Sequence, residues 1–269
     1  MLTNSLDDLY FSASALKTYD TCKLKFKRRY LEGLFWPSDW SQDQEDKEIF
    51  KLGQEFHRLA ERYYSRGRIV DPDSLLSEQM QEWLAQLVEF RPYNNEERFY
   101  PEQELRFNGA GIKLMGKYDL LYISKEGRGI IYDWKTYKQQ PRIEYWRNSL
   151  QTIIYRYLLC KAGDHYAPGV EWNPDQITLI YWNPRFPEDY EPLNYSQWQF
   201  ERDQARIKNL IAEIKALSHD QFYATENEKS CRYCEYRPIC HGEEALRVEL
   251  EEEDLELELA WDEIDEIGF

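Results

Sequence analysis

The stretch that decides the fold is KLMGKYDLLYISKEGRGIIYDWK, which covers residues 113–135. Its flanking segments, Lys113–Ile123 and Gly129–Lys135, are rich in Ile, Leu, Tyr and Trp, and a short turn with one glycine separates them. Aromatic and β-branched runs on either side of such a turn are typical of a β-hairpin. If the turn centres on Glu126, the two strands bring Asp119 opposite Asp133.

Two carboxylates at that position require a compensating cation. Like charges directly opposite each other destabilise a sheet, so Asp119 and Asp133 are not expected to face each other alone. Lys135 lies two residues beyond Asp133, and strand alternation puts both side chains on one face. Two acids and an ammonium group at one point suit a hydrolytic site that uses a divalent metal. A solvated hairpin face with scattered charges would give the same pattern, so the hairpin alone leaves both interpretations open.

The composition is that of a globular protein. The chain has 269 residues, of which 42% are hydrophobic and 16% aromatic, enough for a substantial core. No run of about eighteen apolar residues is present, so no membrane span is expected. The first eight residues lack the basic and apolar regions of a signal peptide, which predicts a cytoplasmic protein.

The net charge of −16 is concentrated at one end of the chain. Residues 243–269 contain thirteen acidic residues and one basic residue, Arg247, so they contribute −12 and the other 242 residues −4. A basic stretch of six lysines and arginines lies between Lys17 and Arg29. We therefore divide the chain into a globular domain, 1–242, and an acidic tail, 243–269. The tail is either a solvated terminus or a segment that binds the protein's own basic surface or a partner.

Hydrophobic periodicity predicts an α/β core behind an N-terminal helical region. Helices are expected at Ser12–Leu34, Lys47–Tyr64, Leu75–Glu89, Asn148–Ala162 and Ser196–Leu217, the third capped by Pro72-Asp73-Ser74. Strands are expected at Tyr100–Phe107, Ile112–Ile123, Arg128–Thr136 and Gln176–Asn183.

Four of the five cysteines have the spacing of a metal centre. Three form C-x2-C-x5-C near the end of the globular part and one lies far upstream (Cys22, Cys231, Cys234 and Cys240). Four thiolates suit tetrahedral zinc or a cubane iron–sulfur cluster, and three thiolates with His241 would also suit zinc. Cys160, on the apolar side of a predicted helix, is most simply a core residue.

Three further polar residues have both a structural and a functional interpretation. His57 falls at the edge of an apolar helix face, where it is either a satisfied structural histidine or a ligand that completes a metal site with the two aspartates. Gln151 and Tyr155 are four residues apart and share a helix face. They could contact a phosphate backbone and a base, and interhelical packing explains them equally well.

The order of these residues resembles the PD-(D/E)xK nucleases of the RecB type: His57, then Asp119, then Asp133-Trp134-Lys135, then Gln151-x3-Tyr155. The cysteine arrangement and the opening segment from Phe11 through Tyr19 are similar to the iron–sulfur subgroup, which includes the AddB helicase–nuclease subunit and the CRISPR adaptation exonucleases. The resemblance extends from about residue 11 to 240. Each motif alone is weak, but together, in this order, they are strong.

The resemblance implies a restriction-endonuclease-like α/β fold, in which a mixed central sheet is flanked by helices and closed by the C-terminal cysteine cluster. It implies that Mg2+ or Mn2+ is bound by the side chains of three residues and one backbone carbonyl (His57, Asp119, Asp133 and the carbonyl of Trp134). Lys135 would orient or activate the attacking water, and Gln151 and Tyr155 would contact the nucleic acid. Glu104, on the strand before the hairpin, would lie behind the metal ligands and help to hold them in place without binding the ion itself.

The four cysteines would hold a [4Fe–4S] cluster that joins the N-terminal helix to the C-terminal end, with zinc as the alternative. Two positions depart from the family pattern: Lys23 follows Cys22 where the family usually has proline, and Leu120-Leu121 follow Asp119 where basic residues are common.

The activity implied is that of a metal-dependent deoxyribonuclease, an exonuclease on single-stranded DNA or DNA ends in repair, recombination or defence. A helicase or another protein is the partner expected for such a nuclease. The alternative is a non-catalytic DNA- or partner-binding module in which the cysteine centre is purely structural.

Overall fold

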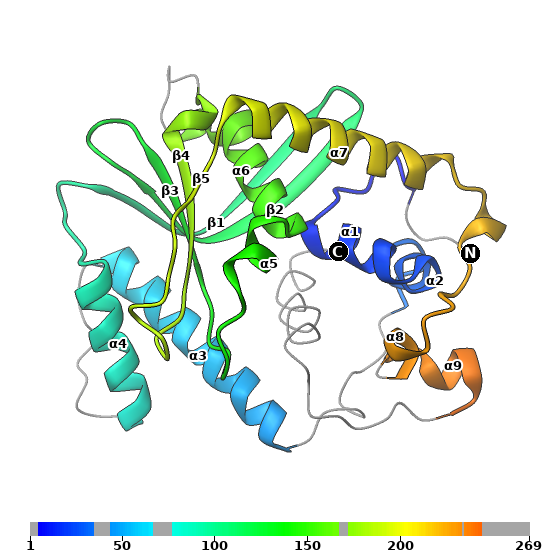
Figure 1. Cartoon of the computed structure of the whole chain (residues 1–269), viewed down its shortest axis with the longest axis horizontal. Helices are drawn as coiled ribbons and strands as arrows, with labels where there is room; N and C mark the ends of the chain where they lie inside the picture. Colours follow the sequence, from blue (N-terminus) through cyan, green and yellow to red (C-terminus); the bar gives the residue numbers. More distant parts are fainter. Residues whose placement is uncertain (1–4, 35–43, 67–76, 167–171, 233, 244–269) are drawn as a thin grey trace. The chain divides into compact units, whose positions relative to one another are not determined.

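The computed structural model describes residues 5–34, 44–66, 77–166, 172–232 and 234–243 (Figure 1). The chain divides into two compact units. The first comprises Met1–Glu48, Asn108–Leu114 and Ala205–Phe269, and the second comprises Ile49–Phe107 and Met115–Gln204. The acidic tail beyond residue 243 and the predicted cap at residues 72–74 lie outside the described residues. The division into 1–242 and 243–269 therefore stays a prediction.

A mixed five-stranded sheet confirms the predicted fold class. Its strands follow one another in chain order: β1 (Arg98–Gly109), β2 (Ile112–Ile123), β3 (Gly129–Trp134), β4 (Ile177–Trp182) and β5 (Leu193–Asn194). The pairing of β2 with β3 is antiparallel, that of β3 with β4 is parallel, and that of β4 with β5 is antiparallel. The two-residue strand β5 was not predicted, because so short a strand has no periodicity to detect.

The β2–β3 hairpin has the register that the sequence predicted. Leu120 pairs with Tyr132 and Ile123 pairs with Gly129, so the hairpin is centred on residue 126. The turn is closed by the Gly127 amide, which donates to the Ser124 carbonyl over 3.0 Å. Gly127 has a φ of 77°, a left-handed conformation that favours glycine.

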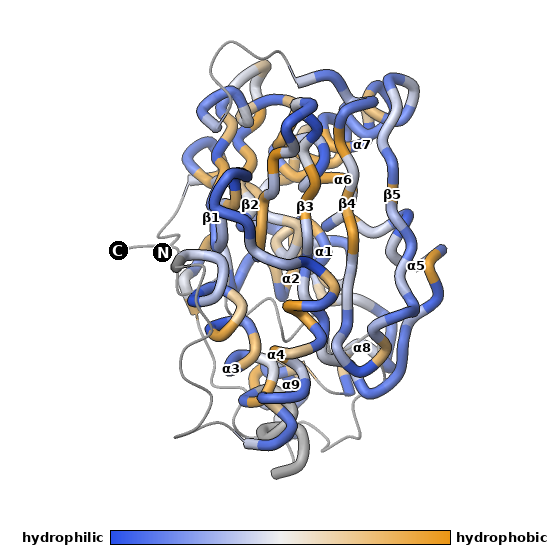
Figure 2. Tube along the Cα trace, turned by 90° about the vertical axis from the view of Figure 1, so that its left-hand side faces the viewer, coloured by the Kyte–Doolittle hydropathy of each residue, from blue (hydrophilic) through white to orange (hydrophobic). Residues whose placement is uncertain are grey.

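Helices of the second unit cover both faces of the sheet. One face packs on α3 (Gln44–Arg66) and α4 (Glu78–Phe90) through a core that includes Phe56, Trp83, Trp134 and Trp182. The other face packs on α6 (Leu150–Ala162), which contacts β3 and β4. Strand alternation explains the division, since Trp134 points to one face and its neighbour Asp133 to the other. Figure 2 shows orange, hydrophobic stretches within β3 and β4, as expected of strands buried on both faces.

Serine caps fix where several helices begin. Ser77 caps α4 and Ser149 caps α6, each accepting a hydrogen bond from the amide three residues later. Between β3 and α6 lies a short helix that was not predicted, α5 (Ile143–Arg147). The remaining elements of this unit are the 3-10 turns η3 (Gly163–His165) and η4 (Pro174–Gln176) and the first part of α7 (Gln197–Ala216), whose second part belongs to the first unit.

In the first unit, the prediction of one continuous helix over Ser12–Leu34 is wrong. The segment forms α1 (Ala13–Thr21), α2 (Lys23–Phe26) and a π-helical turn, η1 (Lys27–Leu31). Cys22 separates α1 from α2 because its backbone is extended, with φ −158° and ψ 112°. Its thiol takes the place of a capping side chain and accepts from the Lys25 amide over 3.4 Å. The pattern of apolar residues continues across this break, so periodicity alone did not reveal it.

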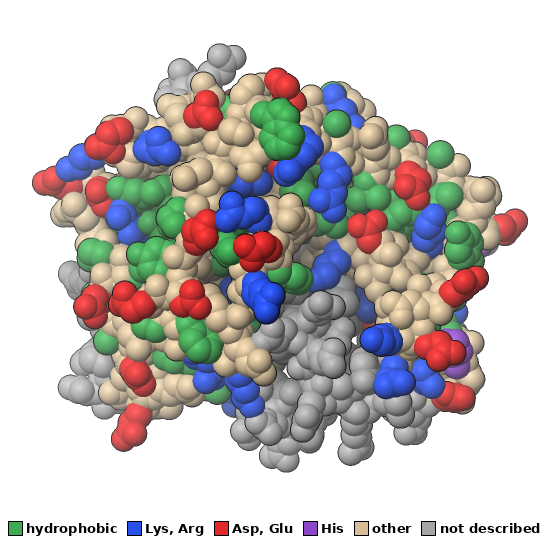
Figure 3. Space-filling view, viewed as in Figure 1, with side chains coloured by type: hydrophobic (Ala, Val, Ile, Leu, Met, Phe, Trp, Pro, Cys, Tyr) green, Lys and Arg blue, Asp and Glu red, His purple; other side chains and the backbone are tan. Residues whose placement is uncertain are grey.

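The first unit also contains the end of the β1–β2 hairpin, the second part of α7 and three short elements, η5 (His219–Gln221), α8 (Glu228–Arg232) and α9 (Arg237–His241). Phe26 is fully buried and stacks on Phe11 and Phe222. On the face shown in Figure 3, side chains of both charge signs are interspersed among apolar ones. Within the described part of the chain, no helix has both the length and the apolar character needed to cross a membrane.

Candidate active site

The site is built where β2 and β3 lie side by side in the second unit. Asp119 directly precedes the paired residue Leu120, and Asp133 directly follows the paired residue Tyr132. The Trp134 amide donates to Asp119 Oδ2 over 2.6 Å, which fixes the orientation of that carboxylate. The hairpin therefore brings the two aspartates to one place, as the sequence predicted.

Helix α3 adds His57 to the two strands. His57 Nδ1 lies 3.3 Å from Asp119 Oδ1, and Nε2 lies 3.0 Å from the Trp134 carbonyl oxygen. The neighbouring Phe56 is fully buried, with its ring edge-on to Trp83, and holds this face of α3 against the core. An imidazole, a carboxylate and a backbone carbonyl thus lie close together at this point.

Strand β1 contributes Glu102, which sequence reasoning missed. The ligand atoms of His57, Glu102 and Asp119 all lie within 4.8 Å of one another, and they form the one such His, Cys, Asp or Glu group found among the residues that the structure describes. Glu102 also forms an ion pair of 2.9 Å with Lys117.

Glu104 was predicted to be the supporting acid on this strand, and the structure instead pairs its carboxylate with Arg106. Glu102 has a φ of 52°, a conformation that breaks the regular strand alternation. Because β periodicity assumes a regular backbone, no sequence pattern distinguishes the two glutamates. The outlier itself is the kind of local strain that occurs at functional sites.

Lys135 and Gln151 complete the polar cluster around Asp133. Lys135 Nζ lies 2.9 Å from Asp133 Oδ1, and the amide of Gln151 donates to Asp133 Oδ2 over 2.9 Å. Gln151 also accepts from Lys135 over 3.3 Å and donates to the hydroxyl of Tyr155 over 3.2 Å. Tyr155 is buried, and its backbone carbonyl accepts from the hydroxyl of Tyr118. Gln151 and Tyr155 therefore belong to the same cluster as the acids, one turn apart on α6.

The electrostatics of the cluster indicate an excess of negative charge. Burial and the nearby Asp119 raise the pKa of Asp133 to about 7, although Lys135 opposes the shift. Burial and Asp119 likewise raise the pKa of Glu102 to about 7 against the effect of Lys117. These carboxylates lack enough positive charge around them to stay ionised as easily as they do in water.

His57 and Asp119 shift in the opposite sense. Burial alone would lower the pKa of His57, but the carboxylates of Asp119, Glu102 and Asp133 raise it to about 9. Burial would raise the pKa of Asp119, and the combined effect of His57, the Trp134 amide and Lys135 lowers it instead. A divalent cation would supply the missing positive charge. Carboxylate oxygens, a carbonyl and an imidazole suit Mg2+ or Mn2+, so the residues present fit such an ion.

The four predicted cluster cysteines all lie in the first unit. Cys22 lies between α1 and α2, Cys231 is in α8, Cys240 is in α9, and Cys234 lies between those two helices. Burial raises the pKa of Cys231, and the thiols of Cys22 and Cys240 add to the shift. The thiol of Cys22 also contributes to the raised pKa of Cys234, behind burial as the main cause.

Basic groups surround these thiols. The guanidinium of Arg28 donates to Cys240 Sγ over 3.0 Å. Lys25 is buried in an ion pair of 2.7 Å with Glu235, next to Cys234. N–H groups and cations directed at sulfur stabilise thiolate ligands. Cys160, expected to be a core residue, is half-buried on α6 in the other unit.

Comparison with known proteins identifies the family to which the chain is similar. A family model described as the PD-(D/E)XK nuclease superfamily matches residues 10–241. Among solved structures, a Eubacterium rectale protein provisionally described as an exonuclease is 13% identical. The match covers 91% of this chain and 92% of that one, with a TM-score of 0.50. SSO0001 is 18% identical over 74% of this chain and 97% of that one, with a TM-score of 0.35.

The search of curated proteins gives no match. At 13% identity the Eubacterium rectale structure shows a likeness of fold alone. The family model, in contrast, spans most of the chain and includes every residue of the cluster on β1, β2, β3, α3 and α6. The chain therefore belongs to the PD-(D/E)XK nuclease superfamily.

Proposed function

We propose that this nuclease-family protein is a Mg2+- or Mn2+-dependent deoxyribonuclease that hydrolyses phosphodiester bonds. We further propose that it acts as an exonuclease on single-stranded DNA or DNA ends, in the cytoplasm and in repair, recombination or defence, with a helicase or another protein as partner. The observation that carries the proposal is the convergence of His57, Glu102 and Asp119 beside Asp133 and Lys135. Structural ion pairs alone do not need three carboxylates around one half-buried imidazole.

The metal would be held by His57, Asp119, Asp133 and the carbonyl of Trp134, and we add Glu102 to this set. When bound, such an ion polarises the phosphate and makes hydroxide available near neutral pH. The protein's own contribution is to fix the ligands and exclude water. The Trp134 amide orients Asp119, and the buried face of α3 holds His57.

Lys135 would act on the nucleophile and the phosphate. Its ammonium group lies between Asp133 and Gln151, where it would donate to an attacking water or a phosphate oxygen. A positive charge at this place offsets the charge that develops on the scissile phosphate. Gln151 and Tyr155 would align Lys135 and Asp133 and, with a strand bound, contact the nucleic acid.

We also propose that Cys22, Cys231, Cys234 and Cys240 hold a [4Fe–4S] cluster, which would make the protein a member of the RecB-like iron–sulfur subgroup. The cysteine spacing and the hydrogen bond from Arg28 to Cys240 support this assignment. Zinc, bound by four thiolates or by three and His241, is the alternative. Iron, sulfide and zinc content of anaerobically purified protein decides between them, and a Cys234→Ser variant should lose the metal.

The nuclease proposal is tested with end-labelled single- and double-stranded DNA, with Mg2+, with Mn2+ and with a chelator. Cleavage should require the metal, and Asp133→Asn should reduce it at least about a hundredfold. Asp175→Asn, the same substitution at an exposed aspartate, is the matched control and should cleave like the parent. An Asp133→Asn protein as active as the parent would show that the assigned site is wrong. DNA binding without any cleavage by the parent would favour the binding-module alternative.

A further inference from the structure

Three aromatic rings surround the ammonium group of Lys135. Its Nζ lies 4.9 Å from the ring centre of Trp146, 5.4 Å from that of Tyr181 and 5.9 Å from that of Tyr137. The three aromatic residues are 2%, 4% and 3% exposed, so none of them is available to stack on a nucleobase. A cation within about 6 Å of a ring centre is attracted by the negative face of the ring, most strongly by tryptophan. We call these three residues the aromatic box.

The rings of the aromatic box also pack on one another. Trp146 and Tyr181 stack with their centres 4.2 Å apart and their planes 24° apart, and Tyr137 stacks on Trp146 at 6.0 Å and 19°. The register of the sheet explains why Tyr181 belongs to the aromatic box. In the parallel pairing of β3 and β4, Tyr181 lies directly beside Asp133. Paired residues point to the same face of a sheet, so the ring lies on the face that carries the acid and Lys135.

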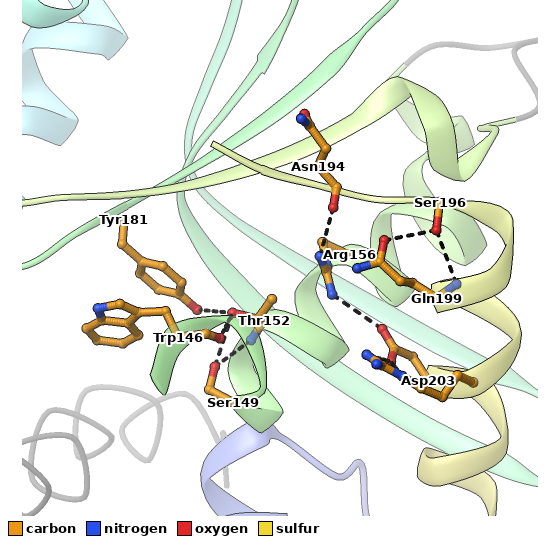
Figure 4. A network of polar contacts seen from close by, with 10 residues as sticks. Trp146, Ser149, Thr152, Arg156, Tyr181, Asn194, Ser196, Gln199 and Asp203 are labelled. Carbon is orange, nitrogen blue, oxygen red and sulfur yellow. Dashed lines mark hydrogen bonds and ion pairs between the residues drawn. The ribbon is translucent and has the colours of Figure 1, made fainter. Parts of the chain in front are cut away.

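The hydroxyl of Thr152 joins two walls of the box (Figure 4). It donates to the backbone carbonyl of Trp146 over 2.7 Å and lies 2.8 Å from the hydroxyl of Tyr181. Ser149 contributes a third bond to the same oxygen, of 3.1 Å. A threonine hydroxyl has one proton, and the carbonyl takes it, so Tyr181 and Ser149 must be the donors in the other two bonds. Thr152 is fully buried, and its hydrogen-bonding capacity is completely used.

We propose that the aromatic box is a positioning device for Lys135 and that Thr152 fixes its geometry. The proposal rests on the proposed function only in taking Lys135 as the residue that acts on water and phosphate. A lysine side chain has four rotatable bonds and would otherwise move freely. Asp133 and Gln151 attract the ammonium group through polar contacts, and the three rings flank it with apolar surfaces that still favour a cation. Trp146, Tyr181, Tyr137 and Thr152 are positioning residues, and they act through Lys135.

The first test does not depend on nuclease activity. In protein labelled with 13C-lysine, ring currents should shift the εCH2 signal of Lys135 upfield of the other lysines, and Lys135→Met assigns the signal by removing it. Trp146→Leu should return the signal most of the way to the ordinary lysine position, and Trp146→Phe should retain part of the shift. Trp198→Leu, which removes an exposed tryptophan, is the control and should leave the signal in place.

The second test measures cleavage with the same variants. Trp146→Leu should lower kcat about a hundredfold with KM for DNA nearly unchanged, because a displacement of about 1 Å at a catalytic group has an effect of that size. Trp146→Phe should recover most of the loss. Thr152→Val, which removes only the hydroxyl, and Tyr181→Phe, which keeps the ring, should each lower kcat by a smaller factor. If Trp146→Leu does not fold, Thr152→Val and Tyr181→Phe test the same role.

The two readouts separate the possible failures. An unshifted Lys135 signal in the parent protein would show that the box does not surround the ammonium group, whatever the activity. A signal that moves in Trp146→Leu while kcat stays unchanged would overturn the positioning role. A shifted signal that responds to Trp146→Leu in a parent protein without nuclease activity would leave the box intact and contradict the proposed function instead.

Discussion

Trp134 holds Asp119 through its backbone: its amide donates to Asp119 Oδ2 over 2.6 Å, which leaves Oδ1 directed at His57. The two oxygens of one carboxylate thus have separate tasks, since one is tied to the hairpin and the other faces the cluster of potential ligands. The tie is made by main chain, so it does not depend on which side chain occupies position 134.

Asp119→Asn should preserve the fold and lose metal binding. The amide oxygen of asparagine can still accept from the Trp134 N–H, but its NH2 group then replaces the oxygen that faces His57. A donor cannot coordinate a cation, so Mn2+ affinity should fall at least about a hundredfold, as measured by calorimetry. An unchanged thermal unfolding midpoint is the control for the fold. Binding of Mn2+ at the parental affinity would remove Asp119 from the ligand set.

Glu102→Gln should weaken Mn2+ binding by about ten- to a hundredfold, because it removes one anionic oxygen from the group formed with His57 and Asp119. Glu104→Gln, two residues along the same strand and paired with Arg106, is the matched control and should bind Mn2+ like the parent. The reverse result, a loss only in Glu104→Gln, would restore the assignment that the sequence suggested.

Gly53→Ala should destabilise the protein, although alanine is the better helix former by about 1 kcal/mol. A Cβ at position 53 of α3 would lie 2.9 Å from the hydroxyl oxygen of Thr136, next to Lys135. We expect the free energy of unfolding to fall by about 1–3 kcal/mol and cleavage to fall with it, since α3 must shift and carries His57. Urea denaturation measures the first effect, and an increase in stability would show that α3 does not approach Thr136 so closely.

Asp203→Ala should cost about 3–5 kcal/mol of stability, because it leaves the guanidinium of Arg156 buried without its carboxylate. The two side chains are 1% and 0% exposed and lie 3.4 Å apart (Figure 4). Arg202→Ala is the control. Arg202 also pairs with Asp203 but is 41% exposed, so its loss should cost no more than about 1 kcal/mol. Equal costs for the two variants would contradict the argument from burial.

Cys160 should react slowly with iodoacetamide. Burial raises the pKa of its thiol to about 12, against the effects of Lys161 and Arg156. Only the thiolate reacts, so at pH 8 the rate should be about a thousandfold below that of an ordinary thiol and rise about tenfold per pH unit. Mass spectrometry of the alkylated peptide follows the rate, with urea-unfolded protein as the reference. Equal rates in folded and unfolded protein would contradict the shifted pKa.

Local patterns predicted much of the fold and part of the site. The hairpin register, the shared face of Asp133 and Lys135, and the i,i+4 pair Gln151 and Tyr155 follow from fixed periods of strand and helix, and the structure has all three. The break at Cys22 escaped prediction because the apolar pattern continues across it. Glu102 was missed because its left-handed backbone violates the alternation on which the prediction relied.

By itself the sequence determined most of the longer helices and strands and which polar residues share a face of one element, because side-chain direction repeats with a fixed period along a regular backbone. Only the tertiary structure decided which elements meet. It brought His57 of α3 to Asp119 of β2, put Tyr181 beside Asp133 through the parallel pairing of β3 and β4, and closed the aromatic box around Lys135 with a helix that has no sequence signal. Contacts between distant elements depend on how buried faces pack across many residues, so the periodicity within one segment cannot predict them.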